Sequence, residues 1–180
     1  MPKLEEMKRD IDIPDDVTVK YKKGLITVKG ERGELKREFS HPRISVSVSK
    51  EKVTVKCSRP TRSEMGLTGT VGALIGNMIT GVKDGYTYRM RVIYSHFPIK
   101  TSVKGDQLVI ENFLGERFPR KALIREGVTA KISGDTITIE GNDKEKVGQT
   151  AANIEYATRV KNYDPRVFQD GIYLVDRGDN

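Results

Sequence analysis

The segment Gly24-Leu25-Ile26-Thr27-Val28-Lys29-Gly30 precedes Gly33-Glu34, and Gly105-Asp106-Gln107-Leu108-Val109-Ile110-Glu111-Asn112 precedes Gly115-Glu116 in the same way. Two more pairs recur: Val53-Thr54-Val55 with Ile137-Thr138-Ile139, and Glu64-Met65-Gly66 with Lys146-Val147-Gly148. The three pairs are offset by 82, 84 and 82 residues. A nearly constant offset over strands and a helix predicts two copies of one small domain.

Each copy places its strands first and its helix last. Alternating or continuous apolar residues predict strands in the first copy near 17–21, 25–28, 35–39, 44–48 and 53–55, and in the second near 89–94, 103, 108–110, 117–123, 128–132 and 136–139. Capping-box spacing at Thr61/Glu64 and Asn142/Glu145 opens each helix. The expected fold is α+β, with two tandem homologous domains, each a small antiparallel sheet covered by one helix. The turn-like segment 81–85 suggests domains 1–82 and 83–180, the second ending in a C-terminal tail.

Charge favours an anionic partner. The chain has 180 residues, a net charge of +7 and a pI of about 9.4. The single Cys57 cannot form an internal disulfide, and residues 1–16 lack the apolar core of a secretory signal, so we expect a cytoplasmic protein. Residues 65–82 carry no charge, but they are short for a membrane span and include five glycines, so no membrane partner is expected.

The helix that contains this uncharged segment has a stripe of small residues. Leu67, Val71, Leu74, Ile75 and Met78 are expected on its buried face, and Gly69, Gly72 and Gly76 on nearly the opposite one. Because glycine is unfavourable inside a helix, the stripe suggests close approach by another backbone, which could belong to the other domain, a protein or RNA. Tolerated glycines with no partner are the alternative.

The residues do not indicate an enzyme. The two histidines, His41 and His96, lie in different copies, and no Cys-x-x-Cys pair or phosphate-binding Gly-x-x-x-x-Gly-Lys-Ser/Thr loop is present. We therefore expect no catalytic residue, no metal, no cofactor and no small-molecule substrate.

Residues 86–125 are more informative, because eight basic residues oppose three acidic ones and six aromatic residues are interleaved with them. Such a segment can bind phosphates and stack on bases. A solvated charged face is the other interpretation. The aromatic octapeptide of an RNA-recognition motif and the Gly-x-x-Gly context of a KH domain are both missing, so we expect an RNA binder that recognises shape and backbone.

Several blocks resemble the large-subunit ribosomal protein six family in its archaeal and eukaryotic branch. They are Gly76-Asn77-Met78-Ile79-Thr80-Gly81-Val82, Met90-Arg91-Val92-Ile93-Tyr94-Ser95-His96-Phe97-Pro98-Ile99, Glu111-Asn112-Phe113-Leu114-Gly115-Glu116, Glu140-Gly141-Asn142-Asp143 and Phe168-Gln169-Asp170-Gly171-Ile172-Tyr173. Their order and spacing match the family over nearly the whole chain.

The resemblance implies a structural constituent of the large ribosomal subunit that supports translation. It implies binding to 23S-type rRNA, mainly by the second copy, near the stalk base and the sarcin-ricin region, with neighbouring ribosomal proteins as partners. The expected rRNA contacts are Arg159, Lys161, Arg166, Phe168, Gln169, Gly171 and Tyr173, followed by Arg91, Tyr94, His96, Arg117, Arg120 and Lys121. Where bacterial members have a basic glycine-rich stretch, this chain has Gln169-Asp170-Gly171, and Asp170 is expected to fold the turn. A stand-alone module that docks a protein on the glycine-backed helix is the leading alternative.

Overall fold

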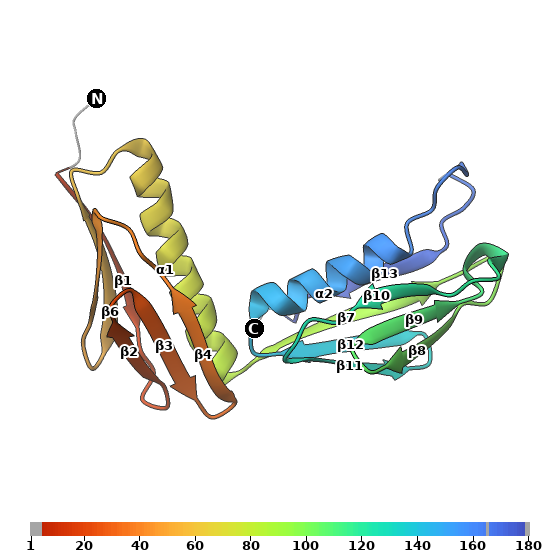
Figure 1. Cartoon of the computed structure of the whole chain (residues 1–180), viewed down its shortest axis with the longest axis horizontal. Coiled ribbons are helices and arrows are strands. Elements are labelled where there is room, and N and C mark those ends of the chain that lie inside the picture. The colour runs from red at the N-terminus through yellow and green to blue at the C-terminus, as the bar shows by residue number, and fades with distance from the viewer. Residues whose placement is uncertain (1–4, 165, 179–180) are drawn as a thin grey trace. The chain divides into compact units, whose positions relative to one another are not determined.

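The structure is a computed structural model that describes residues 5–164 and 166–178. It divides into two compact units, residues 1–85 and 86–180 (Figure 1). Each unit contains antiparallel sheets and one long helix, which confirms the predicted α+β fold.

The first unit has two three-stranded antiparallel sheets, where the sequence suggested one. One sheet has the order β1-β6-β5 and the other is the meander β2-β3-β4. The elements are β1 (Glu6–Asp12), β2 (Thr18–Lys22), β3 (Leu25–Gly30), β4 (Gly33–Glu38), β5 (Ile44–Val48), β6 (Lys52–Ser58) and α1 (Arg62–Lys83). Helix α1 begins with the expected capping box between Thr61 and Glu64.

The core of this unit lies between α1 and the two sheets. Ile26, Val28, Val53 and Val55 point inward from the strands, and Ile75 from the helix, all of them inaccessible to solvent. Helix α1 is long and apolar enough to cross a membrane by length and composition alone. Its buried side chains belong to the core cluster of its own unit, as expected for the core helix of a globular domain.

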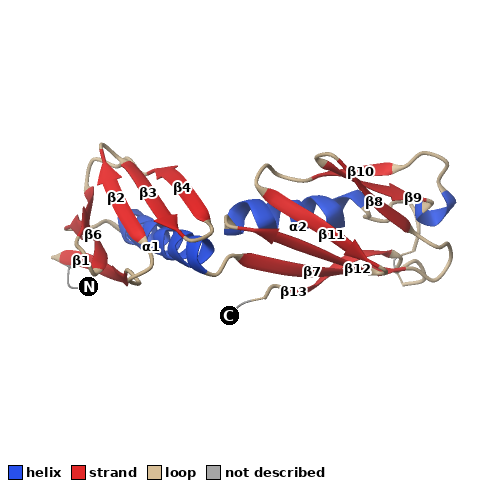
Figure 2. Ribbon diagram, turned by 90° about the horizontal axis from the view of Figure 1, so that it is seen from below, coloured by secondary structure: helices blue, strands red, loops and turns tan. Residues whose placement is uncertain are grey.

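The second unit repeats this order and adds one strand. Its sheets are β10-β9-β8 and β11-β12-β7-β13, and α2 lies on one side of the strands, behind them in Figure 2. The elements are β7 (Tyr86–Ile93), β8 (Lys100–Lys104), β9 (Gln107–Glu111), the 3-10 turn η1 (Phe113–Gly115), β10 (Arg120–Leu123), β11 (Val128–Ser133), β12 (Thr136–Gly141), α2 (Lys144–Ala157) and β13 (Gly171–Asp176).

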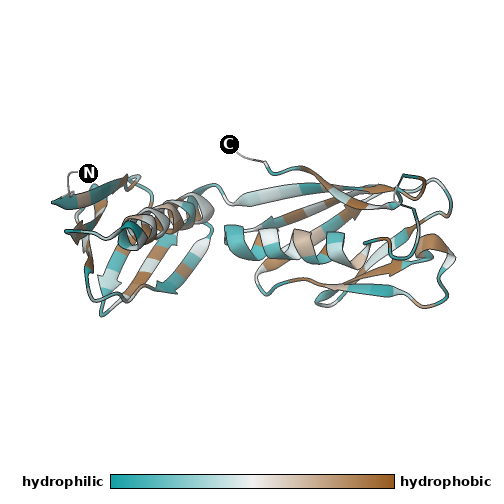
Figure 3. Cartoon of the chain, turned by 90° about the horizontal axis from the view of Figure 1, so that it is seen from above, coloured by the Kyte–Doolittle hydropathy of each residue, from teal (hydrophilic) through white to brown (hydrophobic). Residues whose placement is uncertain are grey.

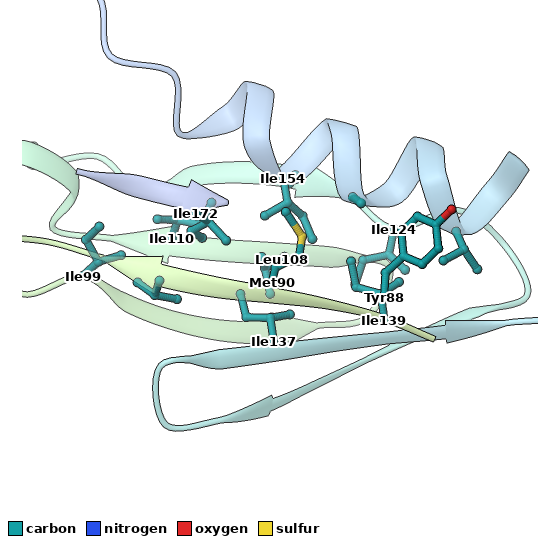
Figure 4. Close-up of a cluster of buried hydrophobic side chains, with 14 of the residues drawn as sticks. Tyr88, Met90, Ile99, Leu108, Ile110, Ile124, Ile137, Ile139, Ile154 and Ile172 are labelled. Atoms are coloured by element: carbon teal, nitrogen blue, oxygen red, sulfur yellow. The ribbon is translucent and has the colours of Figure 1, made fainter. Parts of the chain in front are cut away.

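Alternation along the strands decides which side chains enter the core of the second unit. Brown and teal alternate along its strands in Figure 3, as expected for sheets with one buried face. Met90, Ile137 and Ile139 point from the four-stranded sheet toward Ile154 of α2, and Leu108 joins them from β9 (Figure 4). All five side chains are inaccessible to solvent.

The pairing shows the internal repeat in three dimensions. Strands β1, β6 and β5 pair in the same order as β7, β12 and β11, and the meander β2-β3-β4 corresponds to β8-β9-β10. Strand β13 has no counterpart in the first unit and pairs with the outer edge of β7. The predicted strand pattern began at residue 17 and so missed β1, and it missed β13, which was expected to be a C-terminal tail.

Three helix expectations were wrong. The N-cap of α2 is Asp143, whose carboxylate accepts a hydrogen bond from the Glu145 N–H at 3.0 Å, so the cap lies one residue after Asn142. In α1, Gly72 is buried, and a Cβ added there would lie 2.8 Å from Cδ of Arg9 in β1. Gly72 therefore makes room for a side chain of its own unit, while a Cβ at Gly76 would meet nothing within 4 Å. Leu67, expected in the core, is 39% exposed.

Candidate functional site

Three loops of the second unit lie together at one end of it. They are the β7–β8 loop (94–99), the β9–β10 loop (112–119) and the α2–β13 loop (158–170). Figure 1 shows all three at the same end of this unit. We call this region the three-loop end, and the structure describes all of it except residue 165.

A buried carboxylate holds two of these loops together. Asp170 is 1% exposed, and its carboxylate accepts hydrogen bonds from the Ser95 N–H at 3.0 Å, the Ser95 hydroxyl at 2.9 Å and the His96 N–H at 3.3 Å. Nδ1 of His96 lies 3.3 Å from the same carboxylate. Asp170 was expected to fold its own turn, but the hydrogen bonds that its carboxylate accepts come from Ser95 and His96, so it fixes the α2–β13 loop against the β7–β8 loop.

Burial and hydrogen bonding act on Asp170 in opposite directions. Burial alone would raise the pKa of the Asp170 carboxyl, but the hydrogen bonds from Ser95 and His96 outweigh it and hold that pKa below its usual value. The carboxylate is thus ionised at neutral pH and fully engaged by donors from a loop 75 residues away in sequence.

Aromatic packing reinforces the same junction. The His96 ring stacks on Phe168, with ring centroids 4.4 Å apart and an interplanar angle of 24°. The Tyr163 ring also packs against Phe168 in a tilted arrangement, with the two ring centroids 4.6 Å apart. His96 and Phe168, which were predicted separately as rRNA contacts, are therefore neighbours in the structure.

Arg120 ties the β9–β10 loop to the end of α2. Its guanidinium donates to Glu116 at 2.8 Å, and to the carbonyl oxygens of Ala157 at 2.9 Å and Arg159 at 3.0 Å. A cation at a helix C-terminus is favoured by the helix dipole. The guanidinium also lies 4.3 Å above the buried ring of Phe113, and its hydrogen bond to Glu116 lowers the pKa of that carboxyl.

The Asn-Phe-Leu-Gly block forms the turn at which β9 ends. Asn112, Leu114 and Gly115 all have left-handed backbones, with φ of 59°, 50° and 75°. The Asn112 amide donates to the carbonyl of Pro98 at 3.1 Å, and so joins this loop to the β7–β8 loop. Each of the three loops is therefore bonded to at least one other.

Most of the predicted site residues lie at the three-loop end. Tyr94, His96, Arg117, Arg120, Arg159, Lys161, Arg166, Phe168 and Gln169 are in the loops or at their borders. Gly171 begins β13, and the Tyr173 hydroxyl donates to the Gln169 carbonyl at 3.1 Å. Arg91 lies opposite Tyr173 on the neighbouring strand. Lys121, on β10, is exposed but lies outside the loops.

The surface of the three-loop end combines cations with exposed aromatic rings. Among the residues that the structure describes, all six exposed aromatic side chains belong to the second unit: Tyr94, Phe97, Phe118, Tyr156, Tyr163 and Tyr173. Four of them are in the three loops, and the other two flank the α2–β13 loop. Phe118 was not among the predicted site residues, although it stands between Arg117 and Pro119, outside any apolar alternation.

The first unit offers a different kind of basic surface. A shallow hollow of about 850 Å³ lies along β2, β3 and β4, and is lined in part by Lys20, Lys22, Lys29 and Lys36. Asp16, Glu31 and Glu34 line it too, and none of its lining residues is aromatic. It lacks the arginine–aromatic combination of the second unit. No group of three or more His, Cys, Asp or Glu side chains in the described part of either unit could hold a metal ion.

A duplicated α+β fold whose second copy gathers basic and aromatic side chains on three joined loops presents a surface suited to an anionic partner. Residues 13–85 and 97–171 match the family described as Ribosomal protein L6, one segment for each copy. The chain belongs to this ribosomal protein family, and its role is structural and not enzymatic.

Relatives support the same assignment over almost the full length. Large ribosomal subunit protein uL6 of Methanothrix thermoacetophila is 48% identical over 174 residues, or 97% of this chain and 99% of the relative. The protein of that name from Methanosphaera stadtmanae is 49% identical over 98% of this chain and 97% of its own. That from Methanococcus vannielii is 44% identical over 98% and 97%, respectively.

Proposed function

We propose that this chain is a structural component of the large ribosomal subunit and binds 23S-type rRNA through the three-loop end of its second unit. The observation that carries the proposal is the combination found there, because Arg117, Arg159, Lys161 and Arg166 share one end of the unit with most of its exposed aromatic rings. Arginine and lysine bind phosphate oxygens, and aromatic rings stack on unpaired bases.

The residues have different roles in this proposal. The exposed side chains of Arg159, Lys161 and Arg166 contact rRNA phosphates, with Arg117 beside them. Arg120 is only 23% exposed and bonded to its own unit, so it positions the loops and makes little contact itself. Tyr94, His96, Phe168, Gln169, Gly171 and Tyr173 shape the adjoining surface, and Arg91 and Lys121 extend it along the strands.

The position in the subunit rests on the family. The names of the relatives place them in the large ribosomal subunit, and the resemblance implies a site near the stalk base and the sarcin-ricin region. Neighbouring ribosomal proteins are then further partners, and the cytoplasm is the compartment.

Ultraviolet cross-linking of the full chain to protein-free 23S-type rRNA tests this proposal. Cross-linked peptides, identified by mass spectrometry, should come mainly from 94–99, 112–119 and 158–170. Peptides from the lysine-lined hollow of β2, β3 and β4 would instead make the first unit the principal contact. The absence of any saturable binding to the rRNA would overturn the proposal altogether.

A further inference from the structure

Among the described residues, the most exposed large apolar side chain is that of Phe118, at 85%. It is the middle residue of the segment 116–120, whose two ends are joined by the ion pair between Glu116 and Arg120. A single exposed apolar residue is common on protein surfaces, but Phe118 shares the three loops with three other exposed aromatic rings, those of Tyr94, Phe97 and Tyr163.

The loop that carries Phe118 is held from both sides. Arg120 bonds to Glu116 and to the carbonyl oxygens at the end of α2, so the loop is fixed to a helix. Pro119 has a fixed φ, and a residue before proline is restricted to extended conformations. The backbone of Phe118 therefore has little freedom to lose when its ring meets a partner, which lowers the cost of binding.

The surroundings of the ring identify the kind of partner. Between Phe113 and Arg125 four basic residues oppose one acid, Glu116, and Arg120 already pairs with that acid. Arg117 is next to Phe118 in sequence, and Arg120 bonds to the carbonyl of Arg159, the first cation of the α2–β13 loop. An apolar ring among cations suits a nucleobase, which has an apolar face and is joined to a phosphate.

We propose that Phe118 is a preformed stacking platform for one unpaired base of the rRNA, beside the phosphate-binding cations of the three-loop end. This inference rests on the proposed function and deepens it, because it assigns base stacking to one named ring, Phe118, in a loop that is already fixed. A ring that stacks on a base is tolerant of base identity, since every base has a π-face.

The chain contains no tryptophan, so Phe118→Trp introduces a single fluorophore at this position. Stacking should quench its emission when protein-free 23S-type rRNA is added, and affinity should equal or exceed that of the natural chain. Leu25→Trp is the matched control, because Leu25 is 41% exposed on β3 of the first unit. The Leu25→Trp variant should retain most of its fluorescence emission when it is saturated with rRNA.

Affinity for the same rRNA separates stacking from simple burial. Phe118→Ala should bind about five- to hundredfold more weakly, the range found for loss of one base–aromatic stack. Phe118→Leu, which keeps the apolar volume, should be impaired to a similar degree. Thermal unfolding of both variants should be unchanged, because the ring makes little contact with its own unit.

The outcomes are distinguishable. If every variant and the natural chain fail to bind the rRNA, the proposed function fails. If the natural chain binds, but Phe118→Ala binds equally well and Phe118→Trp is not quenched, the stacking inference is wrong. Unchanged affinity for protein-free rRNA with poor incorporation of Phe118→Ala into large subunits would assign the ring to a protein partner and overturn the inference.

Discussion

The buried carboxylate of Asp170 accepts a hydrogen bond from the backbone N–H of His96 and lies 3.3 Å from Nδ1 of the same histidine. The two residues are 74 positions apart in sequence. Their contact, with those of Ser95, joins the loop after α2 to the loop after β7, so one ionised group helps to fix the shape of the proposed rRNA surface.

Replacing Asp170 by Asn should lower the free energy of unfolding at neutral pH by about 1–3 kcal/mol. The amide oxygen is a weaker acceptor than the carboxylate for the N–H and O–H donors around it, and the buried amide N–H₂ group needs acceptors of its own. Chemical denaturation measures this loss. Asp176→Asn is the control, because it removes the same charge from an exposed position of β13 and should lower the free energy of unfolding far less.

The same substitution should change the response to acid. The pKa of Asp170 is lowered in the folded state, so its contribution to stability is complete above the unfolded-state pKa of about 3.9 and is lost as the pH falls through the lower folded-state value. The free energy of unfolding should therefore fall less steeply below pH of about 4 in Asp170→Asn than in the natural chain. If the free energy of unfolding fell equally steeply with falling pH in both proteins, Asp170 would not be the source of the predicted pH dependence.

Arg120 should affect both stability and binding. Arg120→Ala leaves the carbonyl oxygens of Ala157 and Arg159 without their donor and uncovers Phe113, so we expect a loss of about 1–3 kcal/mol in unfolding free energy. Weaker rRNA binding should follow, because the loop of Phe118 loses its anchor. Arg120→Lys keeps the positive charge but loses the several N–H donors of the guanidinium. It should therefore restore only part of the unfolding free energy and only part of the rRNA affinity. If Arg120→Lys restored the full stability and affinity of the natural chain, Arg120 would act through its charge alone.

The glycines of α1 should respond unequally to alanine. Gly76→Ala fills open space and should stabilise the first unit by up to about 1 kcal/mol through helix propensity. Gly72→Ala places its Cβ 2.8 Å from Cδ of Arg9, so that side chain must move and the gain should be smaller or negative. Thermal unfolding of the two variants side by side checks this, and a larger gain at Gly72 would contradict the packing described here.

Local patterns in the sequence predicted the local part of the fold. The meanders, the hairpin connections and the capping box at Thr61 follow from alternation and turn residues only a few positions apart. Strand β1 was missed because its charged residues outnumber its apolar ones, which suits a sheet edge but hides the strand. Strand β13 was missed because it pairs with β7, about 80 residues earlier in the chain.

The candidate site shows the same limit. Residue types and the family resemblance indicated Tyr94, His96 and Phe168, but the clasp through Asp170 depends on contacts between loops that no spacing reveals. Arg120 was predicted as an rRNA contact because it is basic, whereas the fold directs its donors to Glu116 and to the end of α2. Phe118 was passed over because its exposure is known only once the core is complete.

The salt dependence of rRNA affinity in paired charge variants shows whether rRNA binds at the three-loop end of the second unit. The full chain, Arg159→Ala/Arg166→Ala and the first-unit control Lys20→Ala/Lys22→Ala are titrated with protein-free 23S-type rRNA between low and moderate salt. For the natural chain, log K should fall with log salt by roughly 0.7–0.9 per phosphate neutralised. We expect the second-unit variant to bind more weakly, with a slope reduced by about one to two, and the first-unit control to bind nearly as well as the natural chain. Equal losses in the two variants, or a flat titration of the natural chain, would contradict these expectations.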